Sequence, residues 1–270
     1  MTKKFEIIKT KDSSRRERHL IFGRYGTGKS TLAASVNDGK ALFVCTENGL
    51  DEIDAESFPV CKNFNEVMDQ LKYIYSGDLE HTTICIDTIG GIEQLSNKQV
   101  MVDYNLKSMS SLGYGEAYSL SLENMRKFIN ALGMINSKLN KRIILLGHSV
   151  IRTANDPGMP AYDVNTLACR EKVNELMAAW ADMISFLDTK KYISNEEGKF
   201  GASRVIASDG STRILKCYKN STSECKNRYG IVDDIEIPIV NGYQAIIDAI
   251  KAGRESLNNI KNEDPNKNDK

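Results

Sequence analysis

The sequence predicts an α/β domain with a mostly parallel central sheet, flanking helices and antiparallel strands at the C-terminal edge. Two observations predict this fold class. Short continuous apolar runs, typical of strands buried on both faces, alternate with segments in which apolar residues recur at helical spacing. From about Ala202 onward the pattern changes to strand, turn and strand, which adds antiparallel strands at one edge.

Each element is predicted by its local pattern, in chain order. A short edge strand is predicted over residues 5–9, followed by a charged loop. Apolar runs predict central strands over residues 19–22, 40–46, 82–87, 142–146 and 183–187. Apolar residues three and four positions apart predict helices over residues 30–36, 64–75, 122–139, 173–180 and 243–250. The tetrapeptide SDGS predicts a turn at residues 208–211.

Two stretches lack both patterns. Residues 149–167 predict a long structureless loop, and a loop of that length inside a domain is usually functional. Residues 96–118 predict a helix and then a break rich in glycine and serine. We therefore expect an N-terminal strand and charged loop (1–18), one folded domain (19–252) and a disordered polar tail (253–270).

The composition excludes several classes of protein. Among the 270 residues, 36 basic and 36 acidic side chains balance, so any contact with nucleic acid must be local. The six cysteines form no paired motif, which is typical of reduced intracellular thiols. No segment resembles a signal peptide or a membrane span, and we expect a soluble cytoplasmic protein with no membrane partner.

The stretch GRYGTGKST fits the phosphate-binding pattern G-x-x-x-x-G-K-S, between a predicted strand and a predicted helix. Its glycines let successive backbone N–H groups turn toward one anion. Lys29 is expected to reach the β- and γ-phosphates of a nucleotide, Ser30 to offer its hydroxyl to Mg²⁺, and Thr31 to contact the α-phosphate. The predicted cradle consists of Gly23, Arg24, Tyr25, Gly26, Thr27, Gly28, Lys29, Ser30 and Thr31.

Two carboxylates are expected at the same edge of the sheet. Asp87 ends the apolar run TTICID, which places it where ligands of α/β folds bind, and a carboxylate there holds Mg²⁺. Glu47 follows the strand after the phosphate-loop helix and can orient a water toward the γ-phosphate. The alternative for each residue is a cap on the turn that follows its strand.

Three further residues are candidates. His148 follows the strand over 142–146 and can sense the γ-phosphate, or it is a histidine satisfied by local backbone. Lys226 and Arg228 lie two positions apart in the segment KNRYG, so on an extended backbone they point the same way. A neighbouring subunit can insert such cations as an arginine finger; the alternative is a solvated basic turn.

These features, in this order, resemble the RecA-like ATPase core over residues 18–232, and especially the phage-encoded ATPases built of that core alone, which are implicated in single-strand annealing and recombination. In that family a glutamate closes the strand after the phosphate-loop helix, as Glu47 does in FVCTENGL. A later strand ends in the magnesium aspartate, matching Asp87, and another ends in a polar sensor, matching His148. Lysine–asparagine–arginine near the end reaches across the subunit interface, matching residues 226–228.

The resemblance implies a DNA-stimulated ATPase domain with ATP and Mg²⁺ as cofactors. It also implies a homo-oligomer, as a ring or short filament, with single-stranded DNA and a single-strand-binding or annealing protein as partners. Residues 149–167 match the position of the mobile DNA-binding loop, but they carry one cation, Arg152, beside Asp156 and Asp163. Aromatic residues that can stack on bases are few: Tyr114, Tyr118 and Tyr162.

Three other classes of nucleotide-binding protein can be compared with these features. A GTPase would match DTIG at residues 87–90 and NKND at residues 266–269, but the second motif falls in the polar tail instead of closing a buried strand, so we take that match as chance. A kinase of a small metabolite requires a lid with several arginines, and no such cluster occurs mid-chain. An ATP-gated helicase loader or scaffold with slow turnover is the third alternative.

Overall fold

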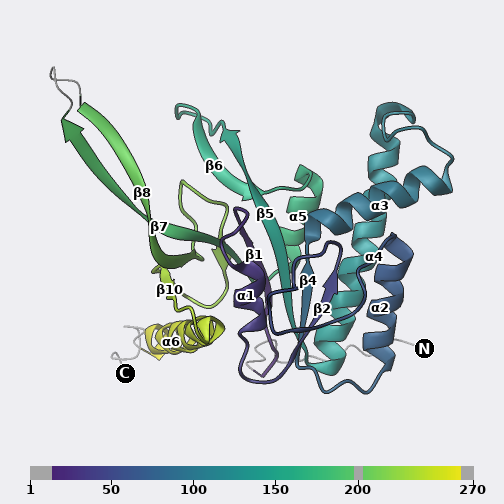
Figure 1. Ribbon diagram of the computed structural model, residues 1–270, viewed down its shortest axis with the longest axis horizontal. Helices are drawn as coiled ribbons and strands as arrows, with labels where there is room; N and C mark the ends of the chain where they lie inside the picture. Colours follow the sequence, from purple (N-terminus) through teal and green to yellow (C-terminus); the bar gives the residue numbers. More distant parts are fainter. Residues whose placement is uncertain (1–13, 198–202, 263–270) are drawn as a thin grey trace, which may run out of the picture.

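The structure is a computed structural model that describes residues 14–197 and 203–262 (Figure 1). The described residues form one sheet in the order β10–β8–β7–β1–β5–β4–β2–β3, with β6 paired to β5 and β9 paired to β7. The strands are β1 (Arg18–Gly23), β2 (Ala41–Cys45), β3 (Glu56–Ser57), β4 (Thr83–Asp87), β5 (Arg142–Ala154), β6 (Tyr162–Leu167), β7 (Met183–Glu197), β8 (Ser203–Lys216), β9 (Lys226–Asn227) and β10 (Ile235–Ile237). The helices are α1 (Lys29–Ala34), α2 (Phe64–Ser76), α3 (Ile89–Asp103), α4 (Glu116–Leu139), α5 (Glu171–Trp180) and α6 (Gly242–Asn262), with a 3₁₀ turn at Gly113–Gly115.

The predicted fold class is confirmed. Strand β1 pairs parallel with both β5 and β7, and β4 pairs parallel with β2 and β5. Strand β8 pairs antiparallel with β7 and β10, which gives the antiparallel strands at the C-terminal edge. Strands β2 to β5 lie on one side of β1, and the later strands β7, β8 and β10 lie on its other side. The strand order therefore reverses at β1. Ligands of open α/β sheets bind at such a point.

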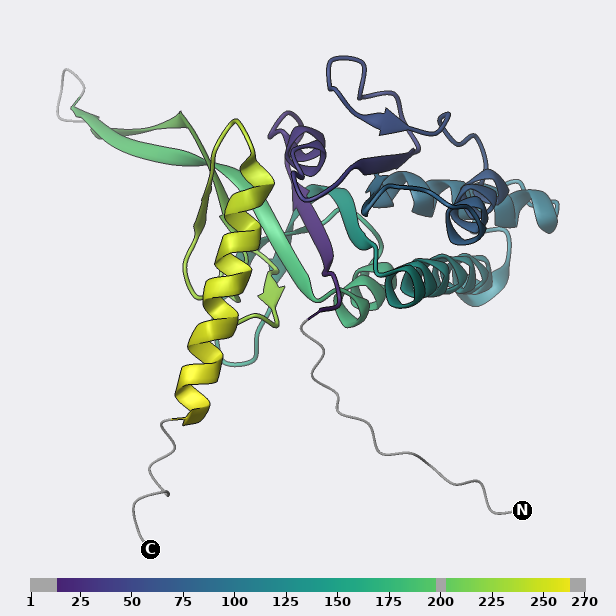
Figure 2. The same cartoon turned by 90° about the horizontal axis from the view of Figure 1, so that it is seen from below.

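Helices cover both faces of the sheet. Leu20 and Phe22 of β1 pack into a core with α2, α3, α4 and α5, whereas Ile21 packs into a core with α1 and α6. This alternation follows from the two-residue period of a strand. Figure 2 shows α6, in yellow, on the side of the molecule away from α2, α3 and α4.

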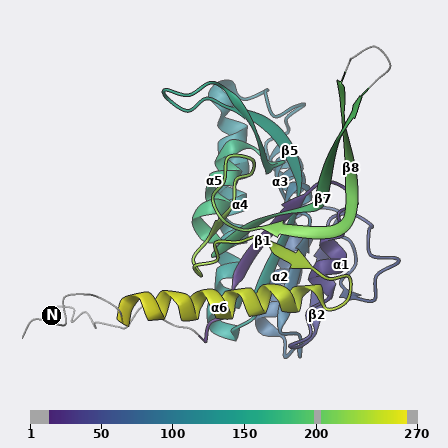
Figure 3. The same cartoon turned by 90° about the vertical axis from the view of Figure 1, so that its left-hand side faces the viewer.

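The prediction of a structureless loop over 149–167 is wrong. Strand β5 continues to Ala154 and pairs antiparallel with β6, so these residues form a hairpin around the segment NDPGMP. Figure 3 shows this hairpin and the β7–β8 hairpin projecting from the same end of the molecule. The apolar side chains of Val150 and Ile151 are exposed, 38% and 53%. Val164, Thr166 and Leu167 of β6 are buried, whereas β5 beyond Ser149 is exposed or half-buried, so the apolar alternation is too short to predict two strands.

Two predictions for the C-terminal part are also wrong. Residues 208–211 lie inside β8, not in a turn. Helix α6 continues to Asn262, so residues 253–262 are helical and do not belong to a disordered tail. The extension has a packing reason, because the Arg254 guanidinium lies 5.0 Å from the centre of the Tyr229 ring and Leu257 packs against Gly230.

Some predictions fall outside the described residues: the edge strand at 5–9, the end of the tail and the NKND motif at 266–269. The helix and break predicted over 96–118 correspond to the end of α3, the 3₁₀ turn and the start of α4. None of the helices in residues 14–197 and 203–262 combines the length and the apolar composition that a membrane span needs.

Candidate functional site

The parallel strands bring four predicted residues to one edge of the sheet. In the register of β1 and β5, Gly23 is paired with His148, and Asp87 at the end of β4 is paired with Cys45 at the end of β2. Glu47 follows two positions after Cys45. Because neighbouring parallel strands end together, residues far apart in the sequence converge around the loop after β1.

The phosphate loop connects β1 to α1, as its sequence predicts. Gly26 and Gly28 have left-handed backbones, with φ of 75° and 79°, which other residues adopt only with strain. The buried Lys29 ammonium donates to the carbonyls of Gly23, at 3.1 Å, and Arg24, at 2.8 Å. Burial lowers the pKa of Lys29, and the nearby Asp87 and Glu47 carboxylates oppose that shift.

The other cradle residues flank this core. The Thr27 hydroxyl donates to the carbonyl of Arg24 at 3.0 Å, which closes the loop on itself. Arg24, Tyr25 and Thr31 are exposed to solvent at the surface of the loop. A side chain at Gly23 would collide with the carbonyl of Leu187, because its Cβ would lie 2.4 Å from that oxygen. Glycine is therefore required where β1 passes against β7.

Ser30 and Asp87 form the predicted metal-binding pair. The Ser30 hydroxyl donates to the Asp87 carboxylate at 2.6 Å. Burial raises the pKa of Asp87, and the hydrogen bond from Ser30 acts against this. The described residues hold no cluster of three His, Cys, Asp or Glu side chains able to bind a metal alone. Two oxygen donors beside a phosphate cradle fit Mg²⁺, which commonly takes one or two protein ligands and completes its shell with phosphate and water.

Glu47, His148 and Tyr25 lie together above the cradle. The His148 Nε2 atom is 3.4 Å from a carboxylate oxygen of Glu47. The Tyr25 ring stacks on the His148 ring, with centroids 3.8 Å apart and planes 23° from parallel. The contact between Tyr25 and His148 is not predictable from the sequence, since it depends on the register of β1 against β5. His148 thus touches both the phosphate loop and the candidate base.

Lys226 and Arg228 are not near the phosphate loop of their own chain. Strand β9 pairs with the first residues of β7, at the amino end of the parallel strands, opposite the cradle. The Lys226 ammonium donates to the carbonyl of Ala178, and Arg228 forms an ion pair with Asp182 at 3.1 Å. Burial lowers the pKa of Lys226.

The structure identifies two residues that the sequence did not. Asp182, almost fully buried, forms ion pairs with Arg15, Arg18 and Arg228. Arg213 of β8 lies against Gly28 of the phosphate loop. Neither residue belongs to a local sequence motif, and their contacts become apparent only from the pairing of the strands.

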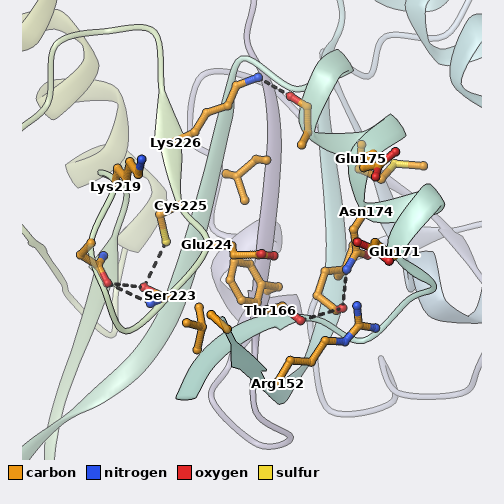
Figure 4. Close-up of a pocket in the computed structure, with 18 of the residues that line it drawn as sticks. Arg152, Thr166, Glu171, Asn174, Glu175, Lys219, Ser223, Glu224, Cys225 and Lys226 are labelled. Carbon is orange, nitrogen blue, oxygen red and sulfur yellow. Dashed lines mark hydrogen bonds between the residues drawn. The ribbon is translucent and has the colours of Figure 1, made fainter. Parts of the chain in front are cut away.

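A cavity of about 750 Å³ lies apart from the phosphate loop, between the β5–β6 hairpin, α5 and residues 219–226 (Figure 4). Leu20, Phe22 and Met177 contribute apolar side chains to it. The charged residues that line it are mixed in sign: Arg152, Lys219, Lys226, Asp156, Glu171, Glu175 and Glu224. Figure 4 shows Arg152, the cation of the predicted DNA-binding segment, at one side of this cavity and Lys226 at the other.

A strand that ends in a glycine-rich loop, a buried lysine inside that loop and a serine–aspartate pair beside it define a P-loop nucleotide-binding protein. The chain belongs to a family of AAA domains, whose model matches residues 15–229. A solved structure titled "Crystal structure of the RadB recombinase" is similar over 84% of this chain and 90% of that chain, with 13% identity and a TM-score of 0.48. The comparison with curated proteins finds no match.

Proposed function

We propose that the chain is a RecA-like ATPase that hydrolyses ATP with Mg²⁺ and acts on single-stranded DNA in phage-type recombination or annealing. The observation that carries the ATPase assignment is the convergence of Lys29, Ser30, Asp87 and Glu47 at one sheet edge. The cation, the metal-binding oxygens and a carboxylate accessible to water are the groups that hydrolysis of a phosphoanhydride requires.

Each residue then has a role that its contacts support. The Gly26 and Gly28 backbone approaches the phosphates, and the Lys29 ammonium exchanges carbonyl partners for phosphate oxygens. Ser30 and Asp87 hold Mg²⁺, which when bound neutralises phosphate charge. Glu47, whose side chain is 53% exposed, orients the attacking water and accepts its proton. His148 senses the site and passes its state along β5 into the hairpin.

The DNA assignment is supported by two segments that project from the end of the molecule at which the phosphate loop lies. Figure 1 places the β5–β6 hairpin and the α3–α4 connection beyond the carboxyl ends of the parallel strands. Tyr114 in that connection is fully exposed and free to stack on a base. Tyr118 is engaged, because the Arg170 guanidinium lies 3.5 Å from its ring centre. Tyr162 at the hairpin donates its hydroxyl to Asp156.

A first prediction concerns stimulation by DNA. Single-stranded DNA should raise the ATP turnover of the wild-type chain several-fold, because occupancy of the hairpin and of the cradle is coupled through β5. The measurement is steady-state phosphate release with and without a single-stranded oligonucleotide, and Lys29→Ala is the inactive control. A slow rate that DNA does not change favours the loader or scaffold, and phosphoryl transfer to a small acceptor favours a kinase.

We further propose that Lys226 and Arg228 act in trans within a homo-oligomer. The Arg228 side chain is 51% exposed although it pairs with Asp182, so a neighbouring subunit can reach it. If Arg228 leaves Asp182 to contact a neighbouring subunit, Asp182 still forms ion pairs with Arg15 and Arg18, so its negative charge stays paired. The cation is therefore available to a neighbour without exposing a buried charge.

A second prediction tests the trans role. Arg228→Ala should lower the turnover number by about 10³-fold, the contribution of an arginine finger. In an equal mixture with Lys29→Ala, each competent site needs an intact cradle and an intact neighbouring finger, so roughly a quarter of wild-type activity should return. Mixtures shown to co-assemble but without recovered activity would contradict the trans assignment.

A further inference from the structure

Arg213 lies beside the phosphate loop although it is far from it in sequence. Strand β8 pairs Arg213 with Thr189 of β7, and β7 pairs its Leu187 with Gly23 of β1. A Cβ placed on Gly28 would be 2.9 Å from the Arg213 Nη1 atom, so the guanidinium touches the last glycine of the cradle. The strand pairing therefore places a cation of the same chain beside the phosphate loop. This cation comes from the β7 side of β1, whereas Asp87 ends β4 on the other side.

This guanidinium has unused hydrogen-bonding capacity. Its Nη2 atom donates to the carbonyl of Pro238, whereas its buried Nε has no hydrogen-bond partner among the described residues. Burial lowers the pKa of Arg213. Among the side chains that the structure describes, none of the carboxylates forms an ion pair with Arg213.

Arg142, which is buried, and Arg18, which is partly buried, are neutralised. Arg142 is paired with Glu17 and Asp38, and Arg18 with Asp182. Arg213 is partly shielded from water and its guanidinium has a donor without a partner in the described part of the chain, so an anion bound beside it would gain charge-assisted hydrogen bonds. At the edge of a phosphate cradle, the anion that fits is a phosphate group.

We propose that Arg213 is a nucleotide-binding residue whose guanidinium contacts the phosphate oxygens of a nucleoside di- or triphosphate held in the cradle of the same chain. The inference rests on the proposed function and extends it, because it gives the site a cation in cis besides Lys29. A guanidinium suits this task, since its planar fork donates two parallel hydrogen bonds to phosphate. The left-handed backbone of Gly28, with φ of 79°, disfavours any side chain at this position, which leaves the space beside it to the Arg213 guanidinium.

The test is the dissociation constant of a fluorescent ADP or ATP analogue for the wild type, Arg213→Gln and Arg213→Lys. Arg213→Gln should bind about 10- to 100-fold more weakly, the effect of losing a charged hydrogen bond. Arg213→Lys should recover part of the affinity as a point charge, and the salt dependence of binding should be smaller in Arg213→Gln. Arg126→Gln is the matched control, because Arg126 is an exposed residue of α4 paired with Glu123.

Three outcomes would overturn the inference. The first is an unchanged dissociation constant in Arg213→Gln. The second is weaker binding in Arg213→Gln and Arg213→Lys together with a Tm of the nucleotide-free protein that falls by the same amount in both variants. Arg213 would then only stabilise the fold through its hydrogen bond to the Pro238 carbonyl. The third is a wild-type protein that binds no nucleotide, which would overturn the proposed function together with the inference and is therefore distinguishable from the other two.

Discussion

Glu47→Gln is expected to bind ATP as the wild type does and to hydrolyse it about 10²- to 10⁴-fold more slowly, the contribution of a positioned general base. The Glu47 carboxylate contacts neither Lys29 nor Ser30 through a hydrogen bond, so the cradle and the metal-binding pair stay intact in the variant. Glutamine keeps the size of the side chain and can still contact His148. It cannot accept a proton from water, so only the chemical step suffers.

The experiment separates binding from chemistry by measuring the ATP dissociation constant and single-turnover phosphate release on the same preparations. Glu52→Gln is the matched control, since Glu52 is an exposed glutamate in the segment after Glu47. A Glu47→Gln variant that releases phosphate at half the wild-type rate or faster would mean that another group orients the water. Weaker ATP binding with an unchanged rate constant would place Glu47 in the cradle instead.

Asp87→Asn is expected to raise the Mg²⁺ concentration needed for ATP hydrolysis and to reduce the rate by at least about 10²-fold, because the site loses its anionic metal ligand. The same change should raise the Tm of the nucleotide-free protein at neutral pH. Burial raises the pKa of Asp87, so the ionised carboxylate disfavours the folded state. Asparagine removes that charge and still offers an oxygen to the Ser30 hydroxyl.

The pH dependence follows from the direction of this shift. A carboxyl group whose folded pKa is raised destabilises the fold above that pKa, and the effect disappears as the pH falls below the unfolded value of 3.8. The Tm advantage of Asp87→Asn should therefore be largest at neutral pH and shrink on acidification. Asp54→Asn, at an exposed aspartate, controls for the loss of one surface charge. A lower Tm in Asp87→Asn at neutral pH, or normal Mg²⁺-dependent hydrolysis, would contradict the assignment.

The part of the fold that the sequence predicts is the part where burial imposes a pattern. The runs that became β1, β2 and β4 are apolar because the sheet is covered on both faces, and the helices on those faces repeat their apolar residues at helical spacing. In the β5–β6 hairpin, burial is confined to Val164, Thr166 and Leu167 of β6, while β5 beyond Ser149 is exposed or half-buried, so the apolar pattern there is too short to predict the strands. Helix α6 continues past Gly253 because it packs on Tyr229 and Gly230, a tertiary contact absent from local sequence.

The same distinction holds for the site. The phosphate loop is a local motif, and Asp87 is marked by the strand that it ends, so both could be placed from the sequence. Arg213 comes from β8, which reaches the loop only through the pairing of β8 with β7 and of β7 with β1. Asp182 likewise meets Arg15 and Arg228 only after the sheet has formed.

The most direct measurement of the central claim is the rate of phosphate release from ATP by the purified chain, with Mg²⁺ and with the metal chelated. We predict hydrolysis that requires Mg²⁺, is absent in Lys29→Ala and is accelerated by single-stranded DNA. The Lys29 ammonium is the buried cation of the cradle. Lys29→Ala therefore removes the phosphate-binding charge, and the residues of the central sheet are unchanged. Hydrolysis that persists in Lys29→Ala, or a wild-type chain that neither binds nor hydrolyses ATP in the presence of Mg²⁺, would contradict this claim.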